Sequence, residues 1–233
     1  MRLREPGDGP LVIGHRGAAA VAPENTLAAL EAAVAARADL VEFDVGPDLR
    51  LAHSPREVPR EQVSLDDALD FLRAHEIGVH LDLKDVGYES EVLEAVRRHR
   101  LLERAVISTT WPSTTRSFAR LAPELTRAIG YPRDRYGVSR LRWPERVTAT
   151  AASTLRQAMP LRVPVLLHRA HANALALHYT LCSRASVAAA HRRGAPVLAW
   201  TANDPATVLQ LSSLGVDAIV SDDPAMARTA LEG

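Results

Sequence analysis

Histidine, arginine and carboxylate side chains gather early in the sequence, at the ends of two predicted strands. His15 and Arg16 follow the apolar residues 11–13, and Glu42 and Asp44 lie within an apolar run. An imidazole can transfer protons near neutral pH, a guanidinium binds anions, and carboxylates bind cations. Side chains of these kinds could therefore hold an anion beside a cation and move protons around it.

Glu42 and Asp44 are two residues apart, so the period of a strand places both carboxylates on one face. Two buried like charges repel each other and lose their hydration, and without a cation at least one should bind a proton. A divalent metal ion would remove both costs. The alternative is a pair of carboxylates that form salt bridges with arginines, and one Glu-x-Asp pattern does not decide between the two.

A third strand pattern, at 78–84, also ends in charged residues that share a face. These are Asp82 and Lys84, and Lys84 is the only lysine in the sequence, since every other basic residue except histidine is arginine. The compact charge of an ammonium group can sit beside a phosphate oxygen and a metal ion, where a planar guanidinium would crowd them. The third strand therefore favours the metal interpretation.

Length and composition predict one domain that spans residues 1–233. The chain is 47% hydrophobic, which is enough for a full core, and its formal net charge of zero argues against a nucleic-acid surface. Cys182 is the only cysteine, and the first ten residues have no apolar signal core, so we expect a reducing, cytoplasmic location. No apolar run reaches the ~18 residues of a membrane span, so stable membrane insertion is not expected.

Strand and helix patterns alternate along the chain. Strands are predicted at 11–14, 39–45, 78–84, 105–108, 125–130, 174–179, 196–201 and 217–221. Helices are predicted at 25–37, 65–75, 89–100, 112–121, 184–193 and 204–213, and residues 163–168, in a proline-rich stretch, are also assigned to a helix. Eight alternating strands predict an α/β fold of the (β/α)8 TIM barrel type, whose functional groups lie at the C-terminal ends of the strands.

Motifs spread over nearly the whole chain resemble those of the glycerophosphodiester phosphodiesterase family. They are His15-Arg16-Gly17, Pro23-Glu24-Asn25-Thr26, Glu42-Phe43-Asp44, His53, Asp82-Leu83-Lys84, and the stretches 197–203 and 215–224. The resemblance implies a TIM barrel. It also implies a small-molecule phosphodiester substrate, which the enzyme converts to glycerol 3-phosphate and an alcohol.

The resemblance also implies roles for individual residues. His15 and His53 would be the general acid and base, and one Mg²⁺ or Ca²⁺ would be bound by Glu42, Asp44 and Asp82. Arg16 and Lys84 would bind the phosphate, and Trp200 would form an apolar wall against the substrate. The alternative for Trp200 is an aromatic residue of the core.

Other residues near these motifs receive structural interpretations. Glu24 could orient Arg16, and Asn25 or Thr26 is expected to cap a helix rather than bind a ligand. Six histidines are expected outside the site, as exposed or packing residues: His75, His80, His99, His168, His171 and His191. His178 could face the pocket, and Cys182 is expected to pack in the interior.

The sequence departs from the family pattern at three points. Asp82 stands where the family usually has glutamate, Ser54 replaces the usual aspartate after the histidine, and the loop 45–52 and the insertion after the second strand are short. The short Asp-x-Lys is similar to that of the spider-venom sphingomyelinase D relatives. Two alternatives stay open: a phospholipase D-like lyase that forms cyclic phosphate from lysophospholipids, and a phosphate-binding barrel without turnover.

Overall fold

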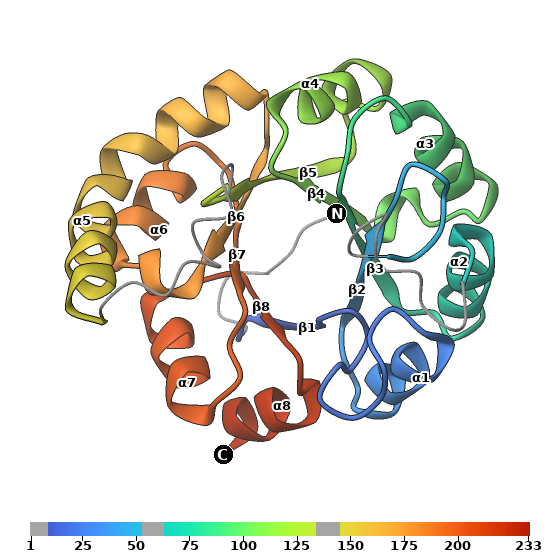
Figure 1. Cartoon of the computed structure of the whole chain (residues 1–233), viewed down its shortest axis with the longest axis horizontal. Coiled ribbons are helices and arrows are strands. Elements are labelled where there is room, and N and C mark those ends of the chain that lie inside the picture. The colour runs from blue at the N-terminus through green and yellow to red at the C-terminus, as the bar shows by residue number, and fades with distance from the viewer. Residues whose placement is uncertain (1–8, 53–62, 134–144) are drawn as a thin grey trace.

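The computed structural model describes residues 9–52, 63–133 and 145–233, with the side chains of 145–152 left out. In this part of the chain eight strands alternate with eight α-helices (Figure 1). The strands are β1 (Leu11–Gly14), β2 (Leu40–Val45), β3 (Gly78–Leu83), β4 (Ala105–Thr109), β5 (Thr126–Tyr131), β6 (Ala174–His178), β7 (Val197–Trp200) and β8 (Ala218–Ser221). The helices are α1 (Leu27–Ala35), α2 (Leu65–Ala74), α3 (Glu89–Arg98), α4 (Pro112–Leu121), α5 (Glu145–Ala170), α6 (Arg184–His191), α7 (Pro205–Leu214) and α8 (Pro224–Glu232).

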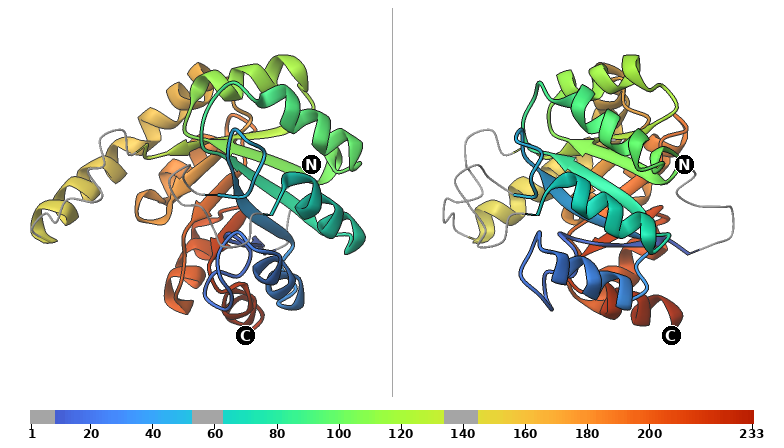
Figure 2. Two further views of the ribbon diagram at one scale, coloured as in Figure 1. Left: turned by 45° about the vertical axis from the view of Figure 1, so that its right-hand side comes forward. Right: turned by 90° about the vertical axis from the view of Figure 1, so that its right-hand side faces the viewer.

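The strands close into a parallel barrel in which each strand pairs with the next and β8 pairs with β1. Figures 1 and 2 show the helices arranged around the outside of this ring, with the N-terminal end of α5 projecting away from it. The predicted TIM barrel is confirmed. The helix predicted at 163–168 is also confirmed, since it belongs to α5.

Alternation of side chains along β2 shows how the barrel divides its two faces. Val41, Phe43 and Val45 are fully buried in the layer between the strands and the helices. Glu42 and Asp44 point to the opposite side, which is the barrel interior. Deeper in that interior the strands contribute small and aliphatic side chains, among them Ile13, Leu40, Val106, Ala128, Leu198 and Ala218. The lower part of the barrel is therefore a packed core, and the charged groups lie above it.

The N-terminal ends of the strands are joined by structural hydrogen bonds. Asp39, Asn173 and Asp217, each just before an even-numbered strand, accept 2.7 Å bonds from the backbone N–H of Val12, Arg127 and Val197 in the preceding odd-numbered strand. These bonds satisfy donors that the parallel ladder leaves unpaired at that end. In barrels of this type the functional groups lie at the opposite end, where the strands have their C-terminal ends.

Helix starts follow the polar residues expected to cap them. Thr26 Oγ1 accepts a hydrogen bond from the backbone N–H of Ala29 at 3.3 Å, so Thr26 is the N-cap of α1, as the sequence predicts. Asp223 and Pro224 open α8 in the same way, with the Asp223 side chain accepting from Met226 N–H. In the described residues no helix combines the length and apolar character that crossing a bilayer requires.

Two glycines allow the turn after β1 to pack against α1. A Cβ on Gly14 would lie 2.4 Å from the Gly17 carbonyl oxygen, and one on Gly17 would lie 2.5 Å from the Ala29 carbonyl carbon. Gly17 also has φ +88°, a conformation that disfavours any side chain. The two glycines therefore fix the backbone that carries His15 and Arg16.

Replacing Gly17 with alanine should destabilise the protein more than replacing Gly215, whose φ of +84° is nearly the same but whose added Cβ would meet nothing within 4 Å. The backbone strain shared by both variants costs about 1 kcal/mol. The clash with α1 should add about 1–3 kcal/mol in Gly17→Ala alone. Urea unfolding of the two variants measures the difference, and equal destabilisation would mean that the turn can move away from α1.

Candidate active site

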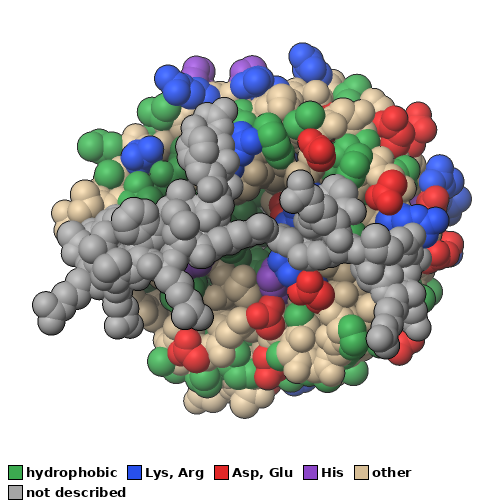
Figure 3. Space-filling model, in the orientation of Figure 1, with side chains coloured by type: hydrophobic (Ala, Val, Ile, Leu, Met, Phe, Trp, Pro, Cys, Tyr) green, Lys and Arg blue, Asp and Glu red, His purple; other side chains and the backbone are tan. Residues whose placement is uncertain are grey.

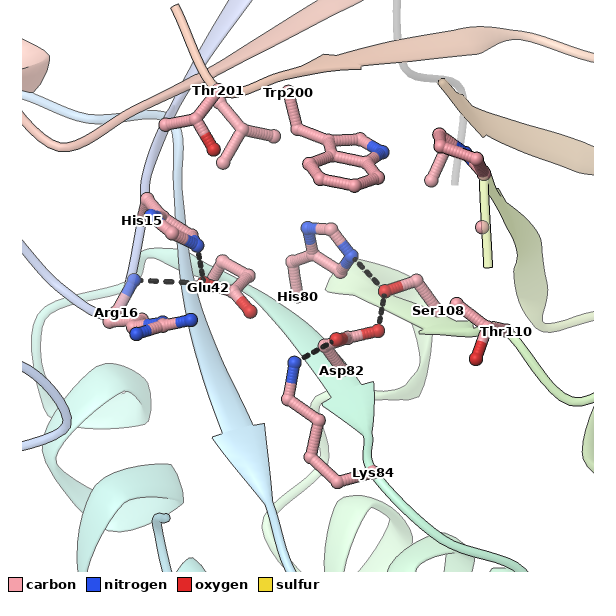
Figure 4. Close-up of a pocket in the computed structure, with 14 residues that line it drawn as sticks. His15, Arg16, Glu42, His80, Asp82, Lys84, Ser108, Thr110, Trp200 and Thr201 are labelled. Carbon is pink, nitrogen blue, oxygen red and sulfur yellow. Dashed lines mark hydrogen bonds and ion pairs between the residues drawn. The ribbon is translucent and has the colours of Figure 1, made fainter. Parts of the chain in front are cut away.

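A pocket opens at the C-terminal ends of the strands, with a volume of about 400 Å³. Figure 3 shows basic, acidic and histidine side chains together near the centre of this face. The pocket is lined by His15, Arg16, Glu42, His80, Asp82, Lys84, Ser108, Thr110, Gly130, Pro132, Ala176, Trp200, Thr201 and Val220 (Figure 4). Its size suits a small-molecule ligand.

Strand register brings three carboxylates together. Asp44 on β2 pairs with Asp82 on β3, and Glu42 lies one inward-facing position below Asp44. Ligand oxygens of the three residues all lie within 4.8 Å of one another, and this is the only such acidic or histidine group in the described residues. The structure therefore brings together the three residues that the sequence predicts as metal ligands.

Asp44 is fully buried and is held by two cations and an amide. Its Oδ2 lies 3.0 Å from Arg16 Nε and accepts from Asn25 Nδ2 at 3.1 Å, while Oδ1 lies 2.5 Å from Lys84 Nζ. The Asn25 side chain also accepts the backbone N–H of Asp44. Asn25 is thus a brace for Asp44 rather than the helix cap, a role that the sequence does not predict.

Glu42 is 3% exposed and its carboxylate is more weakly paired than that of Asp44. Its Oε2 accepts the backbone N–H of Arg16 at 2.8 Å and lies 3.9 Å from His15 Nε2. Burial raises the pKa of Glu42 to about 7, with His15 acting against the shift and Asp44 adding to it. Glu42 is therefore less compensated by positive charge than Asp44, which is the situation that a divalent cation relieves.

The residues present fit a hard divalent cation. Three carboxylates supply only oxygen ligands, as Mg²⁺ and Ca²⁺ prefer. Lys84 Nζ contacts both Asp44 and Asp82. Burial alone would lower the pKa of Lys84, but Asp82 and Asp44 raise it above its ordinary value, so Lys84 is charged. Arg16 and Lys84 both form ion pairs with Asp44. The alternative in which the carboxylates form salt bridges therefore describes Asp44 in part.

Arg16 and Lys84 are both positioned by neighbours. Arg16 Nη1 lies 2.6 Å from Glu24 Oε2, which confirms that Glu24 orients this arginine. The buried Tyr88 hydroxyl accepts the backbone N–H of Lys84 at 3.1 Å and donates to the Val45 carbonyl at 2.6 Å. These bonds tie the ends of β2 and β3 together below the lysine.

His15 forms a pair with an aspartate that the sequence interpretation missed. Its Nδ1 lies 2.5 Å from Asp222 Oδ1, and Asn203 donates to the other Asp222 oxygen at 2.5 Å. Burial would lower the pKa of His15, but Glu42 and the hydrogen bond to Asp222 raise it above its ordinary value. Asp222 directly follows β8, so its place at a strand end was the available signal.

His80 lines the pocket, and the prediction that it lies outside the site was wrong. It is two residues before Asp82 on β3, so the period of the strand gives both side chains the same face. Its Nε2 lies 2.8 Å from Ser108 Oγ. Burial lowers the pKa of His80 to about 4, so the ring is neutral.

Four of the histidines expected outside the site are exposed or paired with aspartates. His75 and His168 are exposed, His99 pairs with Asp66 and Asp70, and His191 pairs with Asp217.

Trp200 lines the pocket. His178 packs edge to face against the Trp200 ring, with 5.0 Å between the ring centroids, and is not among the lining residues. Cys182 is buried in the core. His53 and Ser54 lie outside the described residues.

The fold and the pocket together define a class of protein: a (β/α)8 barrel whose strand ends bring carboxylates, two histidines and two cations into one cavity. The sequence profile of the glycerophosphoryl diester phosphodiesterase family matches residues 15–46 and 68–226. The chain belongs to this family, and it is a phosphodiesterase, an enzyme that hydrolyses phosphodiester bonds. Members of the family generally depend on a divalent cation.

Individual relatives agree with the family assignment. YhdW of Bacillus subtilis (strain 168), provisionally assigned as a glycerophosphodiester phosphodiesterase, is 25% identical over 251 residues, which cover 91% of this chain and 94% of YhdW. A glycerophosphodiester phosphodiesterase of Parabacteroides distasonis shares the fold, with a TM-score of 0.75, 18% identity and coverage of 97% of this chain and 98% of that one. A phosphodiesterase of Oleispira antarctica, solved with the product sn-glycerol-3-phosphate, has a TM-score of 0.73, 23% identity and the same coverage.

Proposed function

We propose that the protein hydrolyses glycerophosphodiesters to glycerol 3-phosphate and an alcohol, and that residues 1–233 form one barrel domain. Glu42, Asp44 and Asp82 would hold one Mg²⁺ or Ca²⁺. When bound, this ion would polarise a phosphoryl oxygen and offset the negative charge of the carboxylates. The observation that carries the proposal is the gathering of His15, the three carboxylates, Arg16 and Lys84 at one pocket.

The cations of the pocket bind and orient the phosphodiester. Arg16 and Lys84 follow β1 and β3 and both contact Asp44. A phosphate oxygen that entered between Arg16 and Lys84 would contact the same two cationic groups that pair with Asp44. Trp200, on the opposite side of the pocket in Figure 4, would cover the apolar part of the substrate. The relative from Oleispira antarctica, which binds sn-glycerol-3-phosphate, supports this substrate class.

His15 supplies a proton to the departing alcohol. Asp222 accepts from Nδ1, so Nε2 is the nitrogen that faces Glu42 and the pocket. The raised pKa of His15 favours the form in which Nε2 is protonated, which is the form that a general acid needs. His53 would remove the proton from the attacking oxygen as this oxygen forms its bond to phosphorus. The phosphorus–oxygen ester bond then breaks, and the alcohol leaves with the proton of His15.

Purified protein with Mg²⁺ or Ca²⁺ should release glycerol 3-phosphate from glycerophosphocholine, and EDTA should abolish the release. His53→Ala should slow it by about 10²–10⁴-fold, as expected when a general base is lost. Turnover that survives EDTA would contradict the metal assignment. Full activity in His53→Ala would contradict the role of that histidine.

The products also distinguish hydrolysis from the cyclising alternative. Asp82 is one methylene shorter than the glutamate that the family usually has at this position. The resulting Asp-x-Lys is similar to that of the sphingomyelinase D relatives. Phosphorus NMR of the reaction should show glycerol 3-phosphate as the accumulating species. A persistent five-membered cyclic phosphate, formed from a lysophospholipid, would instead support the lyase.

A further inference from the structure

One histidine of the pocket takes no part in the mechanism proposed above. His80 lies on β3 with 4% of its surface exposed, and its ring lines the pocket. Figure 4 shows the ring between Glu42 and Ser108, below Trp200 in that view. Because it shares the cavity with the phosphate-binding cations, a ligand that fills the cavity will meet this ring.

Two hydrogen bonds fix which ring nitrogen of His80 carries the proton. Ser108 Oγ donates its single hydrogen to Asp82 Oδ1, 2.6 Å away, because a carboxylate can only accept. Ser108 must therefore accept the bond that joins it to His80 Nε2 at 2.8 Å. Nε2 carries the hydrogen, and Nδ1 carries a lone pair.

His80 Nδ1 is consequently an acceptor without a donor. It is buried and has no hydrogen-bond partner in the part of the chain that the structure describes. Buried polar atoms are nearly always paired, so an exception in the wall of a pocket indicates a group that the ligand supplies. A phosphodiester oxygen only accepts and cannot fill this place, whereas a hydroxyl group can.

We infer that His80 recognises a hydroxyl group of the substrate, by accepting a hydrogen bond at Nδ1 from the glycerol moiety. The identity of that moiety rests on the proposed function, since glycerol is the part of a glycerophosphodiester that carries hydroxyl groups close to the phosphate. His80 is then a specificity-determining residue, and Ser108 is the positioning residue that keeps its lone pair at Nδ1.

Calorimetric titration of the Ca²⁺-containing protein with two phosphate esters tests this inference. Glycerol 3-phosphate and propyl phosphate share the phosphate and the three-carbon chain, but propyl phosphate has no hydroxyl. The unmodified protein should bind glycerol 3-phosphate about five- to tenfold more tightly, the effect of one hydrogen bond. In His80→Phe, which keeps a ring and removes the acceptor, this preference should disappear while the affinity for propyl phosphate stays within about twofold.

Two further variants make the comparison decisive. His168→Phe places the same substitution at an exposed position of α5 and should keep the preference. His80→Leu also removes the acceptor and serves if the phenylalanine does not fit.

The outcomes separate this inference from the proposed function. Equal weakening of both esters in the His80 variants would mean that the ring only shapes the pocket, and an undiminished preference would mean that the hydroxyl binds elsewhere. Either result overturns the inference. A His80-dependent preference without release of product from glycerophosphocholine would instead uphold it while the proposed activity fails.

Discussion

His15→Ala should lower kcat/KM for glycerophosphocholine by about 10²–10⁴-fold, the range expected when a general acid is lost. The Nε2 of His15 faces the carboxylate cluster, and no other histidine in the described residues holds an aspartate at Nδ1 while lining the pocket. Release of glycerol 3-phosphate measures the effect. His168→Ala, an exposed substitution on α5, is the matched control and should leave the rate unchanged.

Asp222→Asn should separate positioning from proton donation at the same histidine. The hydrogen bond from His15 lowers the pKa of Asp222, and the same bond helps to raise the pKa of His15. Without the charge of Asp222, His15 should lose its proton at lower pH. Activity that depends on protonated His15 falls as pH rises through its pKa, so the alkaline limb of the pH–rate profile should move to lower pH. An unmoved limb would exclude His15 as the acid.

Much of the barrel and of the acidic cluster follows from periodicity alone. A strand repeats every two residues, so Glu42 and Asp44, and likewise Asp82 and Lys84, must share a face. Neighbouring parallel strands then bring these faces together at one end of the barrel. This part of the site could be predicted because a charged side chain within an apolar strand needs a partner of opposite charge nearby.

The missed residues depend on contacts across long separations. Asp222 reaches His15 from the other end of the chain, and its place directly after β8 is the one local feature that separates it from the N-cap Asp223. Asn25, whose backbone has φ +59°, braces Asp44 across a separation of 19 residues. The helix α8 was not predicted, although Asp223 and Pro224 at its start are residue types that helix starts favour. His80 was different, since the period of two would have placed it in the pocket.

The metal-free protein should become more stable when Glu42 is replaced by glutamine, provided that the pH is high. Burial raises the pKa of Glu42 to about 7, so the folded state binds this proton more tightly than the unfolded state does. The contribution of such a group to stability is complete below its unfolded pKa of about 4.5 and is lost as pH rises through about 7. At pH 8 the ionised carboxylate should cost the fold roughly 3 kcal/mol.

Urea unfolding in EDTA at pH 5 and pH 8 measures this effect. At pH 5 Glu42→Gln and the unmodified protein should have similar free energies of unfolding, because Glu42 is mostly protonated. At pH 8 the variant should be more stable, by up to roughly 3 kcal/mol. Glu31→Gln, an exposed substitution on α1, should change stability at neither pH.

Divalent cation should reverse the order of the two proteins. An ion bound by Glu42, Asp44 and Asp82 would stabilise the unmodified fold by mass action, and glutamine at position 42 would weaken that binding. The carboxylate that costs stability in EDTA would therefore contribute stability in Mg²⁺ or Ca²⁺. Equal destabilisation by Glu42→Gln at both pH values would show that His15 and Arg16 already compensate the charge. The acidic cluster would then be a salt-bridge network that needs no metal ion.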